Sequence, residues 1–393
     1  MLLAAIVIVT LKNAAAKTND YHVIARWKHI PAMAIEIEPS ELPRVLADPA
    51  VKRADLDVGG KGADAESLPL IGGDKVHLLG FTGRGVTVAV LDTGVDETHP
   101  DLVGRIVDEH CFCFNSDGSG CCPNGLTEQG GAGSAKDDHG HGSNVAGIVG
   151  SRGVVSSVGV APGVNYVVVK VLDRFNRFVS TVQVLNGLDW LIDTHPEVRA
   201  INMSLGTDAL FDSYCDTRTA YTEAFASAIN TLRAGGALSV VSSGNDSSTN
   251  GMEAPACVQN ALSVGAVWDS NVGPKNVFCP EATTAADKIT CFSNSNATLD
   301  MLAPGAPITS DYLDGGLSTF YGTSQAAPHV TGSVAILLEV DPSLKPDDIE
   351  SVLKSNGKPI FDMRNGVTTP RLDIFAAVNA VAPKQKRHRA AQH

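Results

Sequence analysis

The stretch VTVAVLDTG, residues 86–94, decides how the chain folds, because a run of mostly β-branched apolar residues passes directly into Asp92, Thr93 and Gly94. An uninterrupted apolar run is typical of a strand buried on both faces, as in a parallel sheet. Asp92 is therefore expected at the carboxyl end of such a strand, where parallel sheets place their functional sites. Taken alone, an aspartate in this position is more often a turn or capping residue.

Apolar runs of the same kind recur along the chain and alternate with helical patterns. The predicted strands lie at residues 86–91, 166–171, 200–203, 238–241 and 262–267. Between them, apolar residues recur at the three- and four-residue spacing of a helix face. They are Val184, Leu188, Leu191, Ala224, Ala228 and Leu232. This alternation predicts an α/β fold, a mostly parallel sheet with helices on both faces.

The N-terminal segment has the pattern of a small α+β domain. Apolar runs at residues 6–9, 23–25 and 32–37 predict strands, and Ser40 is placed to cap a short helix that follows it. Residues 1–11 also resemble a signal-peptide core, although they lack a basic beginning. A residual signal segment at 1–16 and a strand are both open interpretations.

A glycine-rich stretch at residues 59–63 predicts a linker, with a boundary between residues 58 and 68. We therefore place a small N-terminal domain at residues 1–62 and a large domain at 63–382. The remaining residues, 383–393, form a basic tail that is expected to be flexible. A chain of 393 residues accommodates one large and one small domain.

Composition restricts the partners. The chain has 30 Lys and Arg against 43 Asp and Glu, a net charge of −13, whereas nucleic acids and anionic membranes bind basic surfaces. Its basic run, residues 384–389, lies in the tail. No stretch approaches the roughly 20 apolar residues of a membrane span. We expect a soluble monomer that binds neither nucleic acid nor membrane.

The eight cysteines favour disulfides over a zinc site, because they do not form paired Cys-x-x-Cys motifs with histidine partners. Four of them, Cys111, Cys113, Cys121 and Cys122, cluster in one glycine-rich stretch, which we expect to be a disulfide-braced insertion near the cleft. An even number in loops indicates an oxidising compartment, with bound metal or reduced thiols as the alternative. The pairing cannot be read from the spacing.

Two further segments place polar residues at the start of predicted helices. The first, DHGHGSNVAG at residues 138–147, contains His139 and His141. The second, GTSQAAPHV at residues 322–330, contains Ser324 among small residues, where the hydroxyl is exposed and the first backbone N–H groups are available to an anion. Either histidine alone would more often be structural.

Acyl transfer requires a serine, a histidine and a carboxylate to act together. A serine is inert until a histidine takes its proton, and a buried carboxylate fixes the histidine tautomer. The reaction also needs hydrogen-bond donors for the oxyanion. Asn245 follows the predicted strand at 238–241, so its amide is placed to be such a donor.

In this order the segments resemble those of the subtilisin-like serine protease family. The matching motifs are Asp92-Thr93-Gly94, His141-Gly142-Ser143, Asn202-Met203-Ser204-Leu205-Gly206, Ser243-Gly244-Asn245 and Gly322-Thr323-Ser324. The resemblance covers residues 68–382 and implies that Asp92, His141 and Ser324 form a catalytic triad with Asn245 as an oxyanion donor. His141 matches the family's catalytic histidine and His139 does not, because His141 precedes Gly-Ser and Val-Ala-Gly.

Residues 21–57 also resemble the family's inhibitory propeptide, with residues 6–11 as its first strand. The resemblance then implies a secreted serine endopeptidase made as a zymogen. Its own propeptide would assist folding and occupy the cleft until cleavage near the linker.

The resemblance also implies where protein or peptide substrates bind. One edge would be Ser204, Leu205 and Gly206, and the facing wall Ser242, Ser243 and Gly244. Neither segment carries a charge, which predicts a broad or apolar preference for the residue before the scissile bond.

No cofactor is required for this chemistry, but structural calcium is common in the family. No calcium-binding loop of the family can be matched to this sequence residue by residue. Asp137, Asp138 and the acidic residues around Asp96 are candidates, and solvated surface charge is the more frequent explanation of such residues.

Two other classes stay open: a binding protein that keeps this fold without catalysis, and an intracellular protease with reduced cysteines. All three triad positions and Asn245 carry the residue types that catalysis needs, which favours the secreted enzyme over a binding protein. A count of free thiols would distinguish the intracellular protease from the secreted enzyme.

Overall fold

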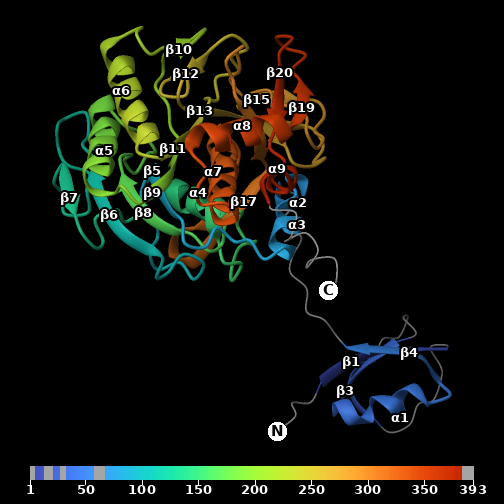
Figure 1. Cartoon of the computed structure of the whole chain (residues 1–393). Helices are drawn as coiled ribbons and strands as arrows, with labels where there is room; N and C mark the ends of the chain where they lie inside the picture. Colours follow the sequence, from blue (N-terminus) through green and yellow to red (C-terminus); the bar gives the residue numbers. More distant parts are fainter. Residues whose placement is uncertain (1–4, 13–20, 27–31, 57–66, 383–393) are drawn as a thin grey trace. The chain divides into compact units, whose positions relative to one another are not determined.

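The computed structural model describes residues 5–12, 21–26, 32–56 and 67–382. The chain divides into two compact units, Met1–Ala63 and Asp64–His393 (Figure 1). Each unit has its own hydrophobic core.

The N-terminal unit is an antiparallel sheet of four strands in the order β2-β3-β1-β4. Its elements are β1 (Ala5–Leu11), β2 (His22–Arg26), β3 (Ala32–Ile37), α1 (Leu42–Leu46) and β4 (Val51–Leu56). The three predicted strands are confirmed, so residues 6–11 form a strand, although residues 1–4 and 13–20 lie outside the described part. The mixed sequence of β4 had given no strand pattern.

The expected cap of the short helix was wrong. Ser40 lies inside a 3₁₀ turn, Pro39–Glu41, and α1 begins after Glu41, whose side chain makes no capping hydrogen bond. Pro43 fixes this start, because proline lacks an N–H and is tolerated in the first helical turn. The helix instead gains its stability from packing, through Val45, which is fully buried against the sheet.

The large unit is built on a ten-stranded sheet in the order β19-β20-β16-β13-β11-β9-β5-β8-β6-β7. All neighbours from β20 to β6 are parallel, and the edge strands β19 and β7 are antiparallel. The bounds are β19 (Lys358–Phe361), β20 (Thr368–Arg371), β16 (Met301–Ala306), β13 (Leu262–Trp268), β11 (Leu238–Ser242), β9 (Val198–Met203), β5 (Thr87–Asp92), β8 (Asn165–Lys170), β6 (Ile106–Phe112) and β7 (Glu128–Gly130). The predicted α/β class and all five predicted strands are confirmed.

Helices cover both faces of this sheet. Along β5, Val88 and Val90 belong to one core cluster and Ala89 and Leu91 to another, so successive side chains enter opposite layers. The first layer contains α2 (Ser67–Leu70), α3 (Gly73–Leu78), α4 (His141–Gly150), α7 (Thr323–Val340), α8 (Pro346–Asn356) and α9 (Ile374–Val381). The second contains the two helices predicted from periodicity, α5 (Thr181–Thr194) and α6 (Ala220–Ala234) (Figure 1).

Three small two-stranded antiparallel sheets complete the unit: β10 (Leu210–Phe211) with β12 (Met252–Glu253), β14 (Lys275–Val277) with β15 (Cys279–Glu281), and β17 (Ile308–Tyr312) with β18 (Gly316–Phe320). All eight cysteines are paired, as Cys111–Cys122, Cys113–Cys121, Cys215–Cys257 and Cys279–Cys291. The prediction of disulfides is therefore confirmed.

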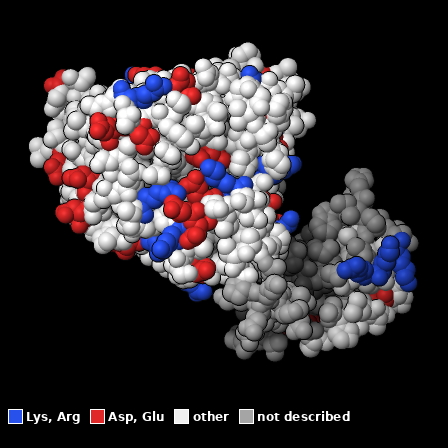
Figure 2. All heavy atoms as spheres, turned by 45° about the horizontal axis from the view of Figure 1, so that its top comes forward, with Lys and Arg blue, Asp and Glu red and all other residues white. Residues whose placement is uncertain are grey.

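The surface of the large unit carries side chains of both charges. On the face drawn in Figure 2, Lys and Arg of the large unit are interspersed with Asp and Glu. Among the described helices, none combines the length and the apolar character needed to cross a membrane. The basic tail lies outside the described residues.

Candidate active site

Asp92 and His141 meet where β5 ends and α4 begins. The His141 Nδ1 atom lies 2.7 Å from Asp92 Oδ1, and both side chains are buried. Gly142 makes this approach sterically possible, because a Cβ atom there would overlap the carbonyl oxygen of Gly94. The glycine that followed the apolar run in the sequence therefore faces a second glycine from a distant segment.

Asp137 holds the start of α4 in place. Its carboxylate accepts hydrogen bonds from the hydroxyls of Thr93 (2.8 Å) and Ser143 (2.7 Å) and from the backbone N–H groups of His139, Gly140 and Ser143. A negative charge there also suits the positive end of the helix dipole. Asp137 was a candidate calcium ligand, but here both its oxygens are used by protein donors.

Ser324 is the second residue of α7. Its hydroxyl donates to the Ser204 carbonyl at 3.2 Å, and the Ser204 hydroxyl donates to the Ser324 carbonyl at 2.7 Å. The next residue, Gln325, donates to the side chain of Asn144 at 3.4 Å, which links the first turns of α7 and α4. Ser324 and His141 thus stand on two joined helix starts, without a direct hydrogen bond in this ligand-free geometry. Such bonds often form only in the substrate complex.

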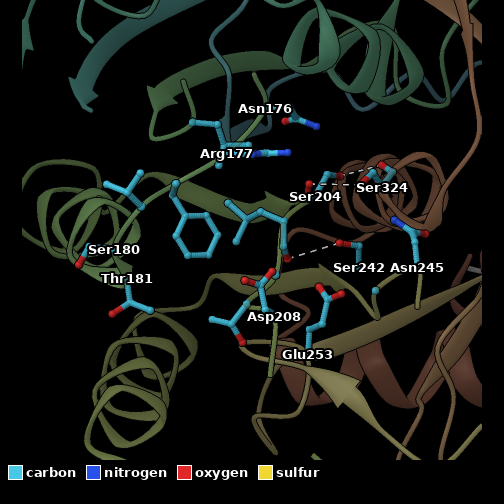
Figure 3. Close-up of a pocket in the computed structure, with 17 residues that line it drawn as sticks. Asn176, Arg177, Ser180, Thr181, Ser204, Asp208, Ser242, Asn245, Glu253 and Ser324 are labelled. Carbon is cyan, nitrogen blue, oxygen red and sulfur yellow. Dashed lines mark hydrogen bonds between the residues drawn. The ribbon is translucent and has the colours of Figure 1, made fainter. Parts of the chain in front are cut away.

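Asn245 lies beside Ser324 at the edge of a cavity (Figure 3). Its Oδ1 atom accepts from the backbone N–H of Thr323 at 2.9 Å and from the Thr323 hydroxyl at 3.1 Å. These two bonds fix the amide plane and leave Nδ2 as the donor. The side chain is therefore oriented as an oxyanion donor requires.

The cavity beside Ser324 has a volume of about 690 Å³. Five of the six predicted substrate-binding residues line it: Ser204, Leu205, Gly206, Ser242 and Gly244. Ser243 does not, because its hydroxyl is turned away and donates to the Asn294 carbonyl at 2.9 Å. The cysteine-rich insertion, residues 111–122, contributes no residue to this lining, and its position near the cleft stays a prediction.

Two acidic residues that sequence reasoning missed also line the cavity, Asp208 and Glu253. Burial raises the pKa of Glu253 to about 9, together with a hydrogen bond and repulsion from Asp246 and repulsion from Asp208. The available signal was a lone acid in the otherwise apolar run Met252-Glu253-Ala254-Pro255. The walls are uncharged, as the sequence indicated, but the cavity as a whole is not.

The calcium candidates are committed to protein partners. Asp138 forms an ion pair with Lys170 at 2.7 Å, and Asp96 accepts from the Thr98 backbone and hydroxyl. Within the described residues, one other group could hold a metal: His99, Asp101 and Asp311, with ligand atoms within 4.8 Å of one another. It does not fit calcium, which prefers six to eight oxygen ligands, because one ligand is a nitrogen and the Asp101 carboxylate accepts from three backbone N–H groups.

Comparison with known proteins gives consistent results. Residues 83–372 match the Subtilase family. The chain is 32% identical to an extracellular serine proteinase of Thermus sp. (strain Rt41A), over 93% of this chain and 79% of that protein. It is 30% identical to subtilisin DY of Bacillus licheniformis, over 75% of this chain and 92% of that protein. A crystal structure of a cold-adapted subtilisin-like serine proteinase superimposes with a TM-score of 0.56 at 29% identity, covering 74% of this chain and 89% of the other.

Proposed function

The chain belongs to the subtilase family and is a serine endopeptidase, and we propose that it cleaves peptide bonds with Asp92, His141 and Ser324 as its triad. The observation that carries this proposal is the 2.7 Å contact between His141 and the buried carboxylate of Asp92, at the start of a helix joined to that of Ser324. No cofactor takes part in the reaction. The substrate is a protein or peptide, and the enzyme acts as a monomer.

The chemistry follows from these positions. His141 Nε2 takes the Ser324 proton as Oγ attacks the scissile carbonyl carbon, and the imidazolium then gives that proton to the leaving amine. Asn245 Nδ2 donates to the carbonyl oxygen as it becomes negative. Water then hydrolyses the acyl-enzyme with His141 again as base, which restores the Ser324 hydroxyl.

A fluorophosphonate probe tests the nucleophile. Wild type should be labelled at Ser324 and Ser324→Ala should not, because the probe reacts only with an activated hydroxyl. Ser343→Ala, which removes an exposed serine three residues beyond the end of α7, is the matched control and should label normally. A folded wild type that is neither labelled nor active on casein would support a binding protein without catalysis.

We propose that the N-terminal unit, residues 1–62, is an inhibitory propeptide that the enzyme removes itself. Its separate hydrophobic core, Val9, Met33, Ile35 and Val45 among others, is what a detachable folding module needs. Mass spectrometry should find wild type without its first 58 to 68 residues and Ser324→Ala with them. Equal masses would remove the self-processing proposal.

We propose that the protein is secreted. Four disulfides favour an oxidising compartment, and the relatives from Thermus and Vibrio alginolyticus are named extracellular serine proteinase and alkaline serine exoprotease. A thiol titration of the natively produced protein in denaturant should find close to none. A count near eight would place the protein in a reducing compartment.

A further inference from the structure

We infer that the cavity beside Ser324 receives a lysine or arginine side chain, the residue before the scissile bond, and that Glu253 selects it. This rests on the proposed function and specifies its substrate. The expectation of a broad or apolar preference considered the uncharged cavity walls alone, without Glu253.

The position of Glu253 carries the inference. Its carboxylate lies between the two walls of the cavity: a Cβ atom on Gly206 would overlap Oε2, and a Cβ atom on Gly244 would lie 2.5 Å from Oε1. Both glycines line the same cavity as Ser324. A substrate side chain that enters between the walls therefore meets this carboxylate.

The surroundings of Glu253 are negative. Asp208 lies on the same side of the cavity, and Arg177 lies on the opposite side (Figure 3). Asp246 also acts on Glu253, and the Asn245 backbone N–H is the one stabilising donor among the main influences. No lysine, arginine or histidine of the described residues lies within 4.0 Å of the Glu253 carboxylate. Glu253 therefore faces two other acids, Asp208 and Asp246, and has no ion-pair partner among the described residues.

A bound cation resolves this unfavourable arrangement. With a pKa of about 9, Glu253 stays protonated in the empty cavity at neutral pH. A guanidinium or ammonium group would stabilise the carboxylate, and the Glu253 proton would leave to solvent. An apolar side chain would displace water from the Glu253 carboxyl and offer it no new hydrogen bond or charge, which is costly, so the cavity discriminates against it.

The carboxylate is held on a rigid base. Glu253 ends β12, where it pairs with Leu210 of β10, and its N–H donates to the Ser243 carbonyl at 3.2 Å. Its carbonyl accepts from Cys257, which is bonded to Cys215. Little order has to be gained when a substrate binds, and this favours discrimination.

The test compares peptide substrates that differ only in having arginine, phenylalanine or leucine before the scissile bond. Wild type should cleave the arginine peptide with the highest kcat/KM. Glu253→Gln keeps the shape but not the charge, and the arginine-to-phenylalanine ratio should fall about 10- to 100-fold, the range for losing a hydrogen bond to a charged group. Glu223→Gln, which removes an exposed carboxylate of α6, should leave the ratio unchanged.

A pH series separates a selective role from a structural one. Arginine stays charged throughout, so the wild-type ratio should rise from about pH 7 to about pH 10 as Glu253 ionises. The ratio cancels the titration of His141, which affects both substrates. Asp208, Asp246 and Arg177 are the other charged groups around the cavity, and they remain in Glu253→Gln, where the ratio should be flat.

The outcomes distinguish this inference from the proposed function. An enzyme that labels at Ser324 but prefers phenylalanine or leucine, with a ratio that Glu253→Gln does not change, overturns the inference and leaves the protease function intact. Absence of labelling and of cleavage of every peptide overturns the proposed function.

Discussion

Asp92 uses a single oxygen to organise the histidine. Its Oδ1 atom lies 2.7 Å from His141 Nδ1 and also accepts from the Thr93 backbone N–H at 2.7 Å. Since a carboxylate only accepts, the His141 proton is held on Nδ1 and Nε2 is left as the base. Thr93 in turn accepts from the N–H of Gly142, so adjacent residues of two segments fix the ring.

The pH dependence of catalysis should reflect this pair. Burial opposes charge on His141, but attraction and a hydrogen bond from Asp92 outweigh it and raise the pKa of His141 above its ordinary value. The base must be neutral, so kcat/KM for a phenylalanine substrate should rise with pH, with a midpoint above about 6.5. Asp92→Asn should move that midpoint down and lower kcat by about 10⁴. A midpoint that stays or rises in the variant would contradict the role given to Asp92.

Asn245→Ala should lower kcat about 10²- to 10³-fold with little change in KM, because its donor acts where charge develops in the transition state. That magnitude is the one known for a subtilisin asparagine. Steady-state kinetics on one peptide measures it, with the exposed Asn230→Ala as control. An increase in KM at unchanged kcat would show that Asn245 only binds substrate.

At the scale of elements, catalysis depends on how closely the first turns of α4 and α7 approach the carboxyl end of the sheet. Gly142 and the Asp137 carboxylate allow α4 to approach the end of the sheet. The hydrogen bond between Gln325 and Asn144 joins α7 to α4. All these partners come from segments far apart in the chain. The site therefore forms only when these helices pack against the sheet.

Asp137→Ala should lower the free energy of unfolding by about 2–4 kcal/mol, since it leaves several buried donors unsatisfied. It should also lower kcat, because the start of α4 carries His141. Urea denaturation in a Ser324→Ala background, which prevents self-digestion, measures the first effect. Asp189→Ala, an exposed position on α5, should change stability by less than about 0.5 kcal/mol. Equal effects of the two variants would mean that Asp137 does not hold α4.

At the scale of the whole molecule, the disulfides close segments of very different length. The Cys215–Cys257 bond spans 42 residues and joins the segments that carry Asp208 and Glu253, whereas Cys113–Cys121 spans 8 within a local insertion. Loop-closure entropy grows with the number of residues enclosed. The long bridge is the one expected to stabilise both the molecule and its cavity.

Replacing both cysteines of Cys215–Cys257 by alanine should therefore cost about 1.5 kcal/mol more in the free energy of unfolding than the same change at Cys113–Cys121. It should also weaken discrimination between arginine and phenylalanine substrates, which the short bridge should not affect. Urea denaturation in the Ser324→Ala background and peptide kinetics in active enzyme measure the two effects. A larger loss at the short bridge would refute the loop-length argument.

The amino-acid sequence alone was enough to predict the fold class, five strands of the central sheet and the four residues that we propose carry the reaction. Those features are local: an apolar run, a helical period, and short motifs whose glycines and polar residues serve the turn in which they stand. The order of the triad residues and the presence of disulfides could be predicted without knowing any contact between distant segments. Which cysteines pair could not be predicted, because their spacing allows several pairings.

The specificity that we infer for the cavity could be recognised only after folding had placed its residues. Ser204 and Gly244 form walls without charge, as the sequence indicated, but Glu253 comes from the short strand β12, outside both motifs, and lies between them. Likewise, the sequence suggested Asp137 as a metal ligand, whereas in the structure its carboxylate holds the start of α4. The physical reason is the same in both cases: the charge and partners of a carboxylate depend on neighbours that are distant in the chain and near only after folding.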